Sequence, residues 1–216
     1  MPLLNRPDIL QFSRQYGFCI YLWSLTEDEE ELARYLPASF HYDSEAKRLF
    51  HSSKRRREWL AARVLLSTAA NINDRICYDD YGHPYLHAAN THIGISHSAD
   101  IVCLALSSQV IGIDVEAISD KAFRMKSKFL SPGEELVFQS QLETAPLETA
   151  TVLWSAKEAV FKQGSGKHLH YITQISLQPT SQYGTLKAIV HDTGGQSINE
   201  TEVAYWVSSD FVITKC

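Results

Sequence analysis

Two carboxylates, Asp114 and Glu116, lie two residues apart in the segment VIGIDVE, residues 110–116. Apolar residues alternate with others along this segment, as in a strand, so both carboxylates point to the same face as Gly112. With a rise of about 3.3 Å per residue, their backbones lie about 6.6 Å apart, close enough for both to bind one hard cation such as Mg²⁺. The alternative is a strand end that turns polar where it meets solvent.

A third carboxylate and a lysine lie in WSAKEAVFK, residues 154–162. Trp154, Glu158 and Lys162 are spaced four residues apart, which places them on one face of a helix. A glutamate four residues before a lysine is also a common exposed pair that stabilises a helix by about 0.2–0.5 kcal/mol. The tryptophan argues against a wholly exposed row, because so large a side chain is seldom left in solvent.

Ser96 and His97 lie in GISHSAD, residues 94–100, where a predicted strand runs into a loop. Neighbouring residues on a strand point to opposite faces, and no GxSxG motif is present, so a Ser-His-Asp hydrolase is not favoured. A loop histidine flanked by hydroxyls suits phosphate binding as well as it suits a turn without a chemical role.

The run Lys54-Arg55-Arg56-Arg57 begins a predicted helix that also carries Arg63. Such a run is usually a solvated helix face. It also suits a dianionic phosphate, because arginine forks match phosphate oxygens and a helix N-terminus adds partial positive charge. Glu134 has a structural explanation instead, since Ser131-Pro132-Gly133-Glu134 is typical of a capping box with proline at the first helical position.

Two strong helices and several strands are predicted to position these residues. An amphipathic pattern covers residues 54–69, and a second helical run covers residues 147–163 and is ended by Gly164 and Gly166. A short helix is predicted to begin at a capping box in residues 26–29 and to stop before Pro37. The predicted strands are RICYD (75–79), THIGIS (91–96), IVCLAL (101–106), YITQISLQ (171–178), TLKAIVH (185–191) and EVAYWVSSDFVIT (202–214).

The composition limits the class of protein. The chain has 216 residues, 44% hydrophobic and 21% charged, with a formal net charge of −5, which excludes a disordered tail, a collagen-like fibre and a coiled coil. The mild acidity argues against a nucleic-acid binder. Four scattered cysteines favour a reducing compartment, and no segment resembles a signal peptide or a membrane span, so we expect a cytoplasmic protein.

A helix followed by three strands occurs twice in this pattern. It predicts an α+β (α/β) protein of two similar halves, each a helix packed on a small, mainly antiparallel sheet. The seam is expected near residues 107–112, which gives halves of residues 1–110 and 111–216, and both VIGIDVE and WSAKEAVFK fall essentially in the second half.

Taken in this order, ISHS, GIDVE and WSAKEAVFK resemble the 4′-phosphopantetheinyl transferases of the long, monomeric surfactin-synthetase-activating (Sfp) type. The segment RRREWLAARVLL is close to what bacterial members carry upstream, and the matching segments span residues 54–166. The resemblance implies two halves related by a pseudo-twofold, with coenzyme A lying between them, in a monomer.

The resemblance also implies roles for single residues. Asp114, Glu116 and Glu158 would be the Mg²⁺ ligands, together with the coenzyme A pyrophosphate, and Lys162 would contact that pyrophosphate. The implied contacts with the other phosphates of coenzyme A, including the 3′-phosphate, are Ser96, His97, Arg56, Arg57 and Arg63. Family members often have Gly-Lys-Pro where this chain has Gly82-His83-Pro84. The histidine lacks the fixed charge of lysine, so a nucleotide contact at this position is either lost or dependent on pH.

The sequence therefore predicts a holo-[acyl-carrier-protein] synthase. It would move the 4′-phosphopantetheine group of coenzyme A to a serine of an apo acyl or peptidyl carrier protein and release adenosine 3′,5′-bisphosphate. Asp114, Glu158 and Lys162 would be catalytic, with Glu158 the favoured base and Glu134 a lesser candidate. One alternative is a coenzyme A binding or sensing module without transfer. The other is a Mg²⁺-dependent nucleotide hydrolase, which is disfavoured because the sequence contains no P-loop motif.

Overall fold

The same strand order occurs twice in the part of the chain that the computed structural model describes, residues 6–164 and 170–216. One five-stranded sheet has the order β1-β5-β4-β3-β2 and the other β6-β10-β9-β8-β7, so the first strand of each set pairs with its last. Two compact units meet in the sequence between Val110 and Ile111. The predicted α+β class is confirmed, while the twofold relation between the halves stays a prediction.

The first unit is built on a sheet whose printed strand pairs are all antiparallel. Its strands are β1 (Cys19–Ser24), β2 (Ile76–Tyr78), β3 (Pro84–Leu86), β4 (His92–Ser98) and β5 (Ile101–Ser107). Strand β5 lies between β1 and β4, and its residues 102–106 are all buried. The sheet extends further than the sequence pattern predicted, because β1 and β3 were not expected.

Helices cover this first sheet. They are α1 (Pro7–Gln15), α2 (Glu29–Arg34), the short helix Ala38–Phe40, α3 (Tyr42–Leu49) and α4 (Ser53–Val64), which continues as a π-helical turn, Leu65–Ala69. Helix α4 packs against β5 and buries Trp59, Leu60, Val64 and Leu65, as its periodicity predicted. The capping box predicted in residues 26–29 is wrong, because Asp28 and Glu31 form it and the helix then buries Leu32.

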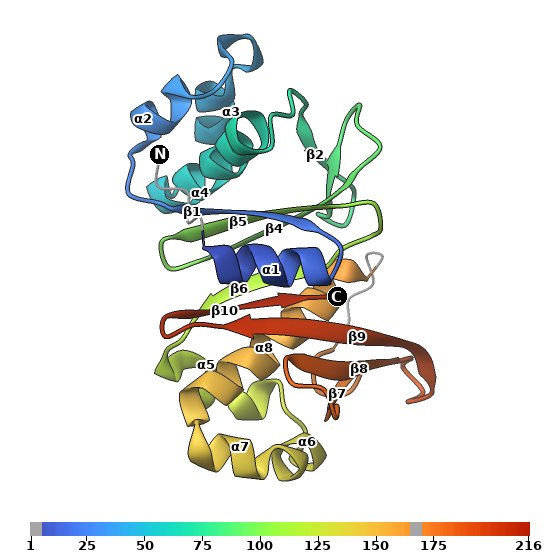
Figure 1. Cartoon of the computed structure of the whole chain (residues 1–216). Helices are drawn as coiled ribbons and strands as arrows, with labels where there is room; N and C mark the ends of the chain where they lie inside the picture. Colours follow the sequence, from blue (N-terminus) through green and yellow to red (C-terminus); the bar gives the residue numbers. More distant parts are fainter. Residues whose placement is uncertain (1–5, 165–169) are drawn as a thin grey trace. The chain divides into compact units, whose positions relative to one another are not determined.

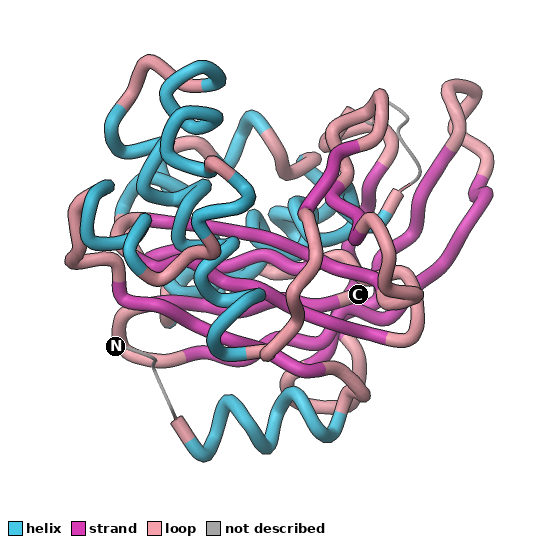
Figure 2. The backbone as a smooth tube through the Cα atoms, turned by 90° about the horizontal axis from the view of Figure 1, so that it is seen from above, coloured by secondary structure: helices cyan, strands magenta, loops and turns pink. Residues whose placement is uncertain are grey.

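The second unit has an antiparallel sheet of the same order. Its strands are β6 (Ile113–Ala117), β7 (Ile175–Pro179), β8 (Thr185–His191), β9 (Ser197–Val207) and β10 (Phe211–Lys215). The stretch predicted as one strand over residues 202–214 is two, because the Ser208 hydroxyl accepts hydrogen bonds from the backbone of Asp210 and Phe211 and closes a turn. Figure 2 shows these strands in magenta.

One long helix dominates the second unit. Helix α8 (Pro146–Gln163) packs on β6 and β10 and buries Leu153, Ala156 and Val160, with Gly164 as its C-cap (Figure 1). Gly166, the second predicted stop signal, lies outside the described residues. The shorter helices are α5 (Asp120–Arg124), the turn Lys126–Lys128, α6 (Pro132–Val137) and α7 (Gln139–Thr144). No described helix has the length and hydropathy needed to cross a bilayer.

Candidate active site

Strand β6 and helix α8 approach each other very closely at Gly112. A Cβ atom at this position would lie 2.0 Å from the carbonyl oxygen of Ala159, so only glycine permits the observed distance between the two backbones. The glycine backbone also exchanges two hydrogen bonds with Cys216 at the end of the sheet. This contact brings the face of the strand that carries Asp114 and Glu116 against α8.

Asp114 is a buried carboxylate with two partners on α8. It is 2% exposed, its Oδ2 accepts from the Ser155 hydroxyl at 2.7 Å, and its Oδ1 accepts from the Lys162 ammonium at 2.6 Å. Ser155 in turn shares a hydrogen bond with Thr214 on β10. The position of the Asp114 carboxylate is therefore fixed from two sides.

Glu116 and Glu158 lie beside Asp114. The indole of Trp154 donates to Glu116 at 3.0 Å, and the hydroxyl of Tyr171 donates to Glu158 at 2.9 Å. Burial raises the pKa of Glu158, and the negative charges of Asp114 and Glu116 raise it further, whereas Lys162 and the Tyr171 hydroxyl act in the opposite direction. The three carboxylates therefore share one electrostatic environment.

The column predicted on α8 thus faces the carboxylates of β6. Trp154 binds Glu116, Lys162 binds Asp114, and Glu158 is electrostatically coupled to both carboxylates. Gly112, at the other end of the alternating face, meets the same helix. A row of exposed side chains does not describe this arrangement, since Asp114 is almost inaccessible and only about a third of the Lys162 side chain is exposed.

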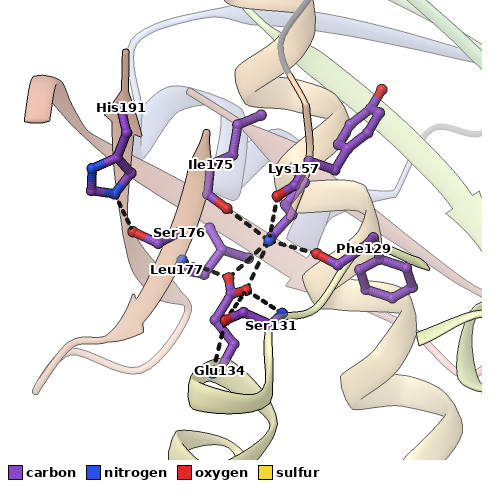
Figure 3. Close-up of polar contacts among 9 residues, drawn as sticks. Phe129, Ser131, Glu134, Lys157, Ile175, Ser176, Leu177 and His191 are labelled. Carbon is purple, nitrogen blue, oxygen red and sulfur yellow. Dashed lines mark hydrogen bonds and ion pairs between the residues drawn. The ribbon is translucent and has the colours of Figure 1, made fainter. Parts of the chain in front are cut away.

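Glu134 and Lys157 form a second charged pair, in which Lys157 is the residue next to Glu158 on α8. The Lys157 ammonium lies 2.9 Å from a Glu134 carboxylate oxygen, and both residues are buried (Figure 3). The predicted capping box of Ser131 and Glu134 is confirmed, and Glu134 also accepts from the backbone of Leu177. These contacts give Glu134 a structural role.

Ser96 and His97 lie in the first unit, within strand β4, which extends through Ser98 instead of opening into a loop at Ser96. Ser96 is 3% exposed, while the more exposed His97 ring lies near α4. Its Nε2 lies 2.8 Å from the guanidinium of Arg55, and its Nδ1 lies 3.5 Å from the carboxylate of Glu58. The basic run on α4 and the histidine on β4 therefore meet.

The three arginines implied as phosphate contacts have different surroundings. Arg56 pairs with Glu29 at 2.7 Å and donates to two backbone carbonyls, and Arg57 donates to the carbonyl of Glu27 at 3.4 Å. Arg63 is 3% exposed, and its guanidinium carbon lies 3.2 Å from the ring centroid of Trp59. Burial lowers the pKa of Arg63. The implied phosphate contact of Arg63 stays a prediction that this burial does not favour.

Comparisons with known proteins place the second unit in a family. Residues 110–216 match the family model described as the 4′-phosphopantetheinyl transferase superfamily. The chain is 31% identical over 131 residues to the 4′-phosphopantetheinyl transferase AcpT of Salmonella typhimurium, covering 59% of this chain and 68% of that protein. The chain belongs to the 4′-phosphopantetheinyl transferase superfamily.

Two further transferases match shorter stretches. The chain is 29% identical over 115 residues to the 4′-phosphopantetheinyl transferase gsp of Aneurinibacillus migulanus, covering 52% of this chain and 48% of that protein. It is 32% identical over 96 residues to the 4′-phosphopantetheinyl transferase Sfp of Bacillus subtilis, covering 44% of this chain and 42% of that protein. The prediction of a phosphopantetheinyl transferase is confirmed at the level of the superfamily.

The carboxylates of this superfamily member fit Mg²⁺ in their chemistry. Hard carboxylate oxygens are the ligands that this ion prefers, and Glu116 and Asp114 bind Trp154 and Lys162, which lie four residues on either side of Glu158 on α8. Within residues 6–164 and 170–216, no three such side chains are arranged around one point as a metal site. Binding would therefore require the side chains of Asp114, Glu116 and Glu158 to turn toward a common ion.

Several residues that contact the predicted side chains within each unit were not themselves predicted. Ser155 lies in WSAKEAVFK but was not distinguished from its neighbours, and Tyr171 lies beyond every motif. Arg55 lies in the predicted basic run, but its pairing with Glu58, three residues later on the same helix, was not predicted. Their contact with His97 depends on how α4 packs on the sheet, which local spacing does not encode.

Proposed function

We propose that this protein transfers the 4′-phosphopantetheine group of coenzyme A to a serine of an acyl or peptidyl carrier protein in a Mg²⁺-dependent reaction. The observation that carries the proposal is the cluster of Asp114, Glu116, Glu158 and Lys162 on β6 and α8, inside the stretch that matches the family. Three carboxylates beside one ammonium suit phosphoryl transfer, in which a protein mainly neutralises charge and aligns the reacting groups.

Asp114, Glu116 and Glu158 would hold Mg²⁺ together with the pyrophosphate of coenzyme A. Bound there, the ion would supply charge neutralisation for the phosphates during transfer. The support is the hard-oxygen donor set and the raised pKa of Glu158, since a carboxylate near two others favours a cation as a neighbour.

In this proposal Glu158 acts as the base and Lys162 stabilises charge on the leaving group. Glu158 accepts the proton of the carrier serine, directly or through a water, as the serine oxygen attacks the phosphorus. The bond from that phosphorus to the bridging oxygen breaks, and adenosine 3′,5′-bisphosphate leaves. Lys162 stabilises the negative charge that builds on the leaving phosphate or protonates that group.

We also propose that residues of the first unit contact the phosphates of coenzyme A, as the family resemblance implies. The proposed phosphate contacts are His97, Ser96 beside it, and Arg57 on α4. The contact of His97 on β4 with the basic end of α4 supports this assignment. Arg56 is already engaged by Glu29 and two carbonyls, so we assign it to holding α4 in place. We assign Arg63 to the core beside Trp59.

We also propose that the protein works as a cytoplasmic monomer of the Sfp type, with coenzyme A and an apo carrier protein as its partners. The four cysteines, Cys19, Cys77, Cys103 and Cys216, lie far apart in the sequence with no CxxC pair, which suits a reducing compartment. The repeated strand order supports a chain that carries two related halves by itself.

The proposal is tested with a panel of apo acyl and peptidyl carrier proteins. We expect intact-mass spectrometry to show the mass of one phosphopantetheine added to one serine of at least one carrier, and the gain to disappear when Mg²⁺ is chelated. Asp114→Asn, which keeps the size of the side chain, should lose this activity. A protein that binds coenzyme A and modifies no carrier would instead be a binding module.

A further inference from the structure

The ring of Tyr171 lies on the face of α8 that carries Glu158. Its centroid is 5.5 Å from the Trp154 ring and 5.6 Å from the Phe161 ring, with interplanar angles of 35° and 32°. These two contacts come from the same helix and lie on either side of Glu158 in the sequence. They fix the ring so that its hydroxyl donates to Oε1 of Glu158 at 2.9 Å.

The backbone of Tyr171 is held by a different group, the ammonium of Lys157. This ammonium donates to the carbonyl oxygen of Tyr171 at 2.8 Å, and the lysine side chain has no solvent exposure. Figure 3 shows the same nitrogen reaching the carbonyls of Phe129 and Ile175 and the carboxylate of Glu134. A single buried cation thus fastens three segments of the second unit to α8.

A buried ammonium needs compensation because it has lost its water. Here the compensation comes from Glu134, which lies 2.9 Å away and is itself held by the Ser131 hydroxyl and the Leu177 amide. Packing α8 on the sheet does not by itself require a charge at this position, since apolar side chains would fill it. What the charge adds is a fixed direction for three carbonyl groups, one of which belongs to Tyr171.

We propose that Tyr171 is a positioning residue for Glu158, and that the buried Lys157–Glu134 pair acts on the same carboxylate through Tyr171. With Oε1 held by the Tyr171 hydroxyl, the orientation of the Glu158 carboxylate is set and Oε2 is left for a metal ion. A hydrogen bond of this kind to a ligating carboxylate commonly raises metal affinity. The inference rests on the proposed function, because that function gives Glu158 a metal to bind.

The test replaces Tyr171 by phenylalanine, which keeps the ring between Trp154 and Phe161 and removes only the hydroxyl. Mn²⁺ serves as the probe, with binding followed by electron paramagnetic resonance in the presence of coenzyme A and without a carrier protein, so that no turnover is measured. We expect Tyr171→Phe to weaken Mn²⁺ binding about tenfold. Its melting temperature and its affinity for coenzyme A without metal should match those of the wild type.

A matched control is Tyr183→Phe. Tyr183 is 88% exposed and its ring meets Tyr205, so the same chemical change is made without removing the hydrogen bond to Glu158. We expect no change in Mn²⁺ affinity for this variant. An equal loss in both variants would overturn the inference, because it would not depend on the bond to Glu158.

The second part of the proposal is tested with Lys157→Met and Glu134→Gln made together, so that neither charge is left buried alone. We expect this protein to bind Mn²⁺ more weakly than the wild type, and the addition of Tyr171→Phe to weaken it little further, because both changes act through one hydroxyl. Fully additive losses would contradict action through Tyr171. The single Tyr171→Phe variant tests the bond to Glu158 whether or not the paired variant folds.

The outcomes separate this inference from the proposed function. A wild-type protein that binds Mn²⁺ and transfers phosphopantetheine, beside a Tyr171→Phe variant that binds Mn²⁺ as tightly or more tightly, overturns the positioning role alone. A wild-type protein that binds no Mn²⁺ with coenzyme A contradicts the proposed metal site, and the inference falls with it.

Discussion

The ammonium of Lys162 lies 2.6 Å from Oδ1 of Asp114, although the two residues are 48 positions apart in the sequence. About a third of the lysine side chain is exposed, whereas the aspartate is almost wholly buried. Lys162 therefore neutralises a buried carboxylate from the solvent side of the site. In the proposed function, the same ammonium would face the phosphate oxygens of coenzyme A.

Replacing Lys162 by methionine should lower the rate of transfer more than the affinity for coenzyme A. A charge at the pyrophosphate contributes most as negative charge builds in the transition state, so we expect kcat to fall about 10²-fold or more, with a smaller change in the KM for coenzyme A. Steady-state kinetics at saturating carrier protein measure both. If only KM rises, Lys162 holds the ligand and has no catalytic role. Lys187→Met, at an exposed lysine paired with Glu200 on the sheet, is the matched control.

Arg57 and Arg56 should respond differently to the same substitution. Arg57→Gln should weaken binding of coenzyme A more than binding of dephospho-coenzyme A, which lacks the 3′-phosphate. Arg56→Gln should chiefly lower the melting temperature, because Arg56 holds Glu29 and two carbonyls. Calorimetric titration with the two nucleotides and thermal melts distinguish these effects. Equal loss of both ligands in Arg57→Gln would point to general electrostatics.

Gly112→Ala tests whether the close approach of β6 and α8 builds the site. The added carbon would lie 2.0 Å from the Ala159 carbonyl oxygen, so the helix must shift, and we expect a loss of about 1–3 kcal/mol in the free energy of unfolding together with loss of transfer. Gly133→Ala is the control, since the nearest atom to its new carbon would be 3.9 Å away. Urea denaturation of both variants provides the comparison. An unchanged stability in Gly112→Ala would show that the approach is looser than described.

The pair of Glu29 and Arg56 should contribute stability that depends on pH. The hydrogen bond from Arg56 holds the pKa of Glu29 below its usual range in the folded protein. Its contribution is therefore complete above the ordinary pKa of glutamate and is lost as pH falls through the lowered value. Glu29→Gln should be less stable than the wild type at pH 6, and the difference should shrink as the pH falls below the ordinary pKa of glutamate. Glu30→Gln, at the next, exposed residue, should show no such trend.

Local patterns predicted which side chains share a face in the candidate cluster on β6 and α8. Alternation in VIGIDVE placed Asp114 and Glu116 on one face, and a spacing of four placed Glu158 and Lys162 on one face of a helix. These two faces were predictable because the period of a strand or a helix is a property of the segment itself. In the structure the two faces meet each other. The identity of the partners, such as Lys162 with Asp114, depends on packing and was not predicted.

The parts that the sequence did not predict share a physical cause. Strand β1 pairs with β5, far along the chain, so no neighbouring turn marks it. Arg63 follows the basic run on the same helix, yet it is buried. Its guanidinium lies over the Trp59 ring and donates hydrogen bonds to the backbone carbonyls of Trp59 and Ile76. Tyr171 has no motif around it at all. Each depends on tertiary contacts, which neither periodicity nor composition carries.

The central claim is that a carrier serine attacks a phosphorus of coenzyme A in this protein and that adenosine 3′,5′-bisphosphate leaves from the same phosphorus. The most direct measurement quantifies adenosine 3′,5′-bisphosphate and carrier protein mass in the same reaction, with coenzyme A and Mg²⁺, with and without the apo carrier. The account predicts one bisphosphate released for each phosphopantetheine gained by a carrier serine, and none without carrier. Bisphosphate released without any carrier, or coenzyme A bound with no product at all, would contradict it.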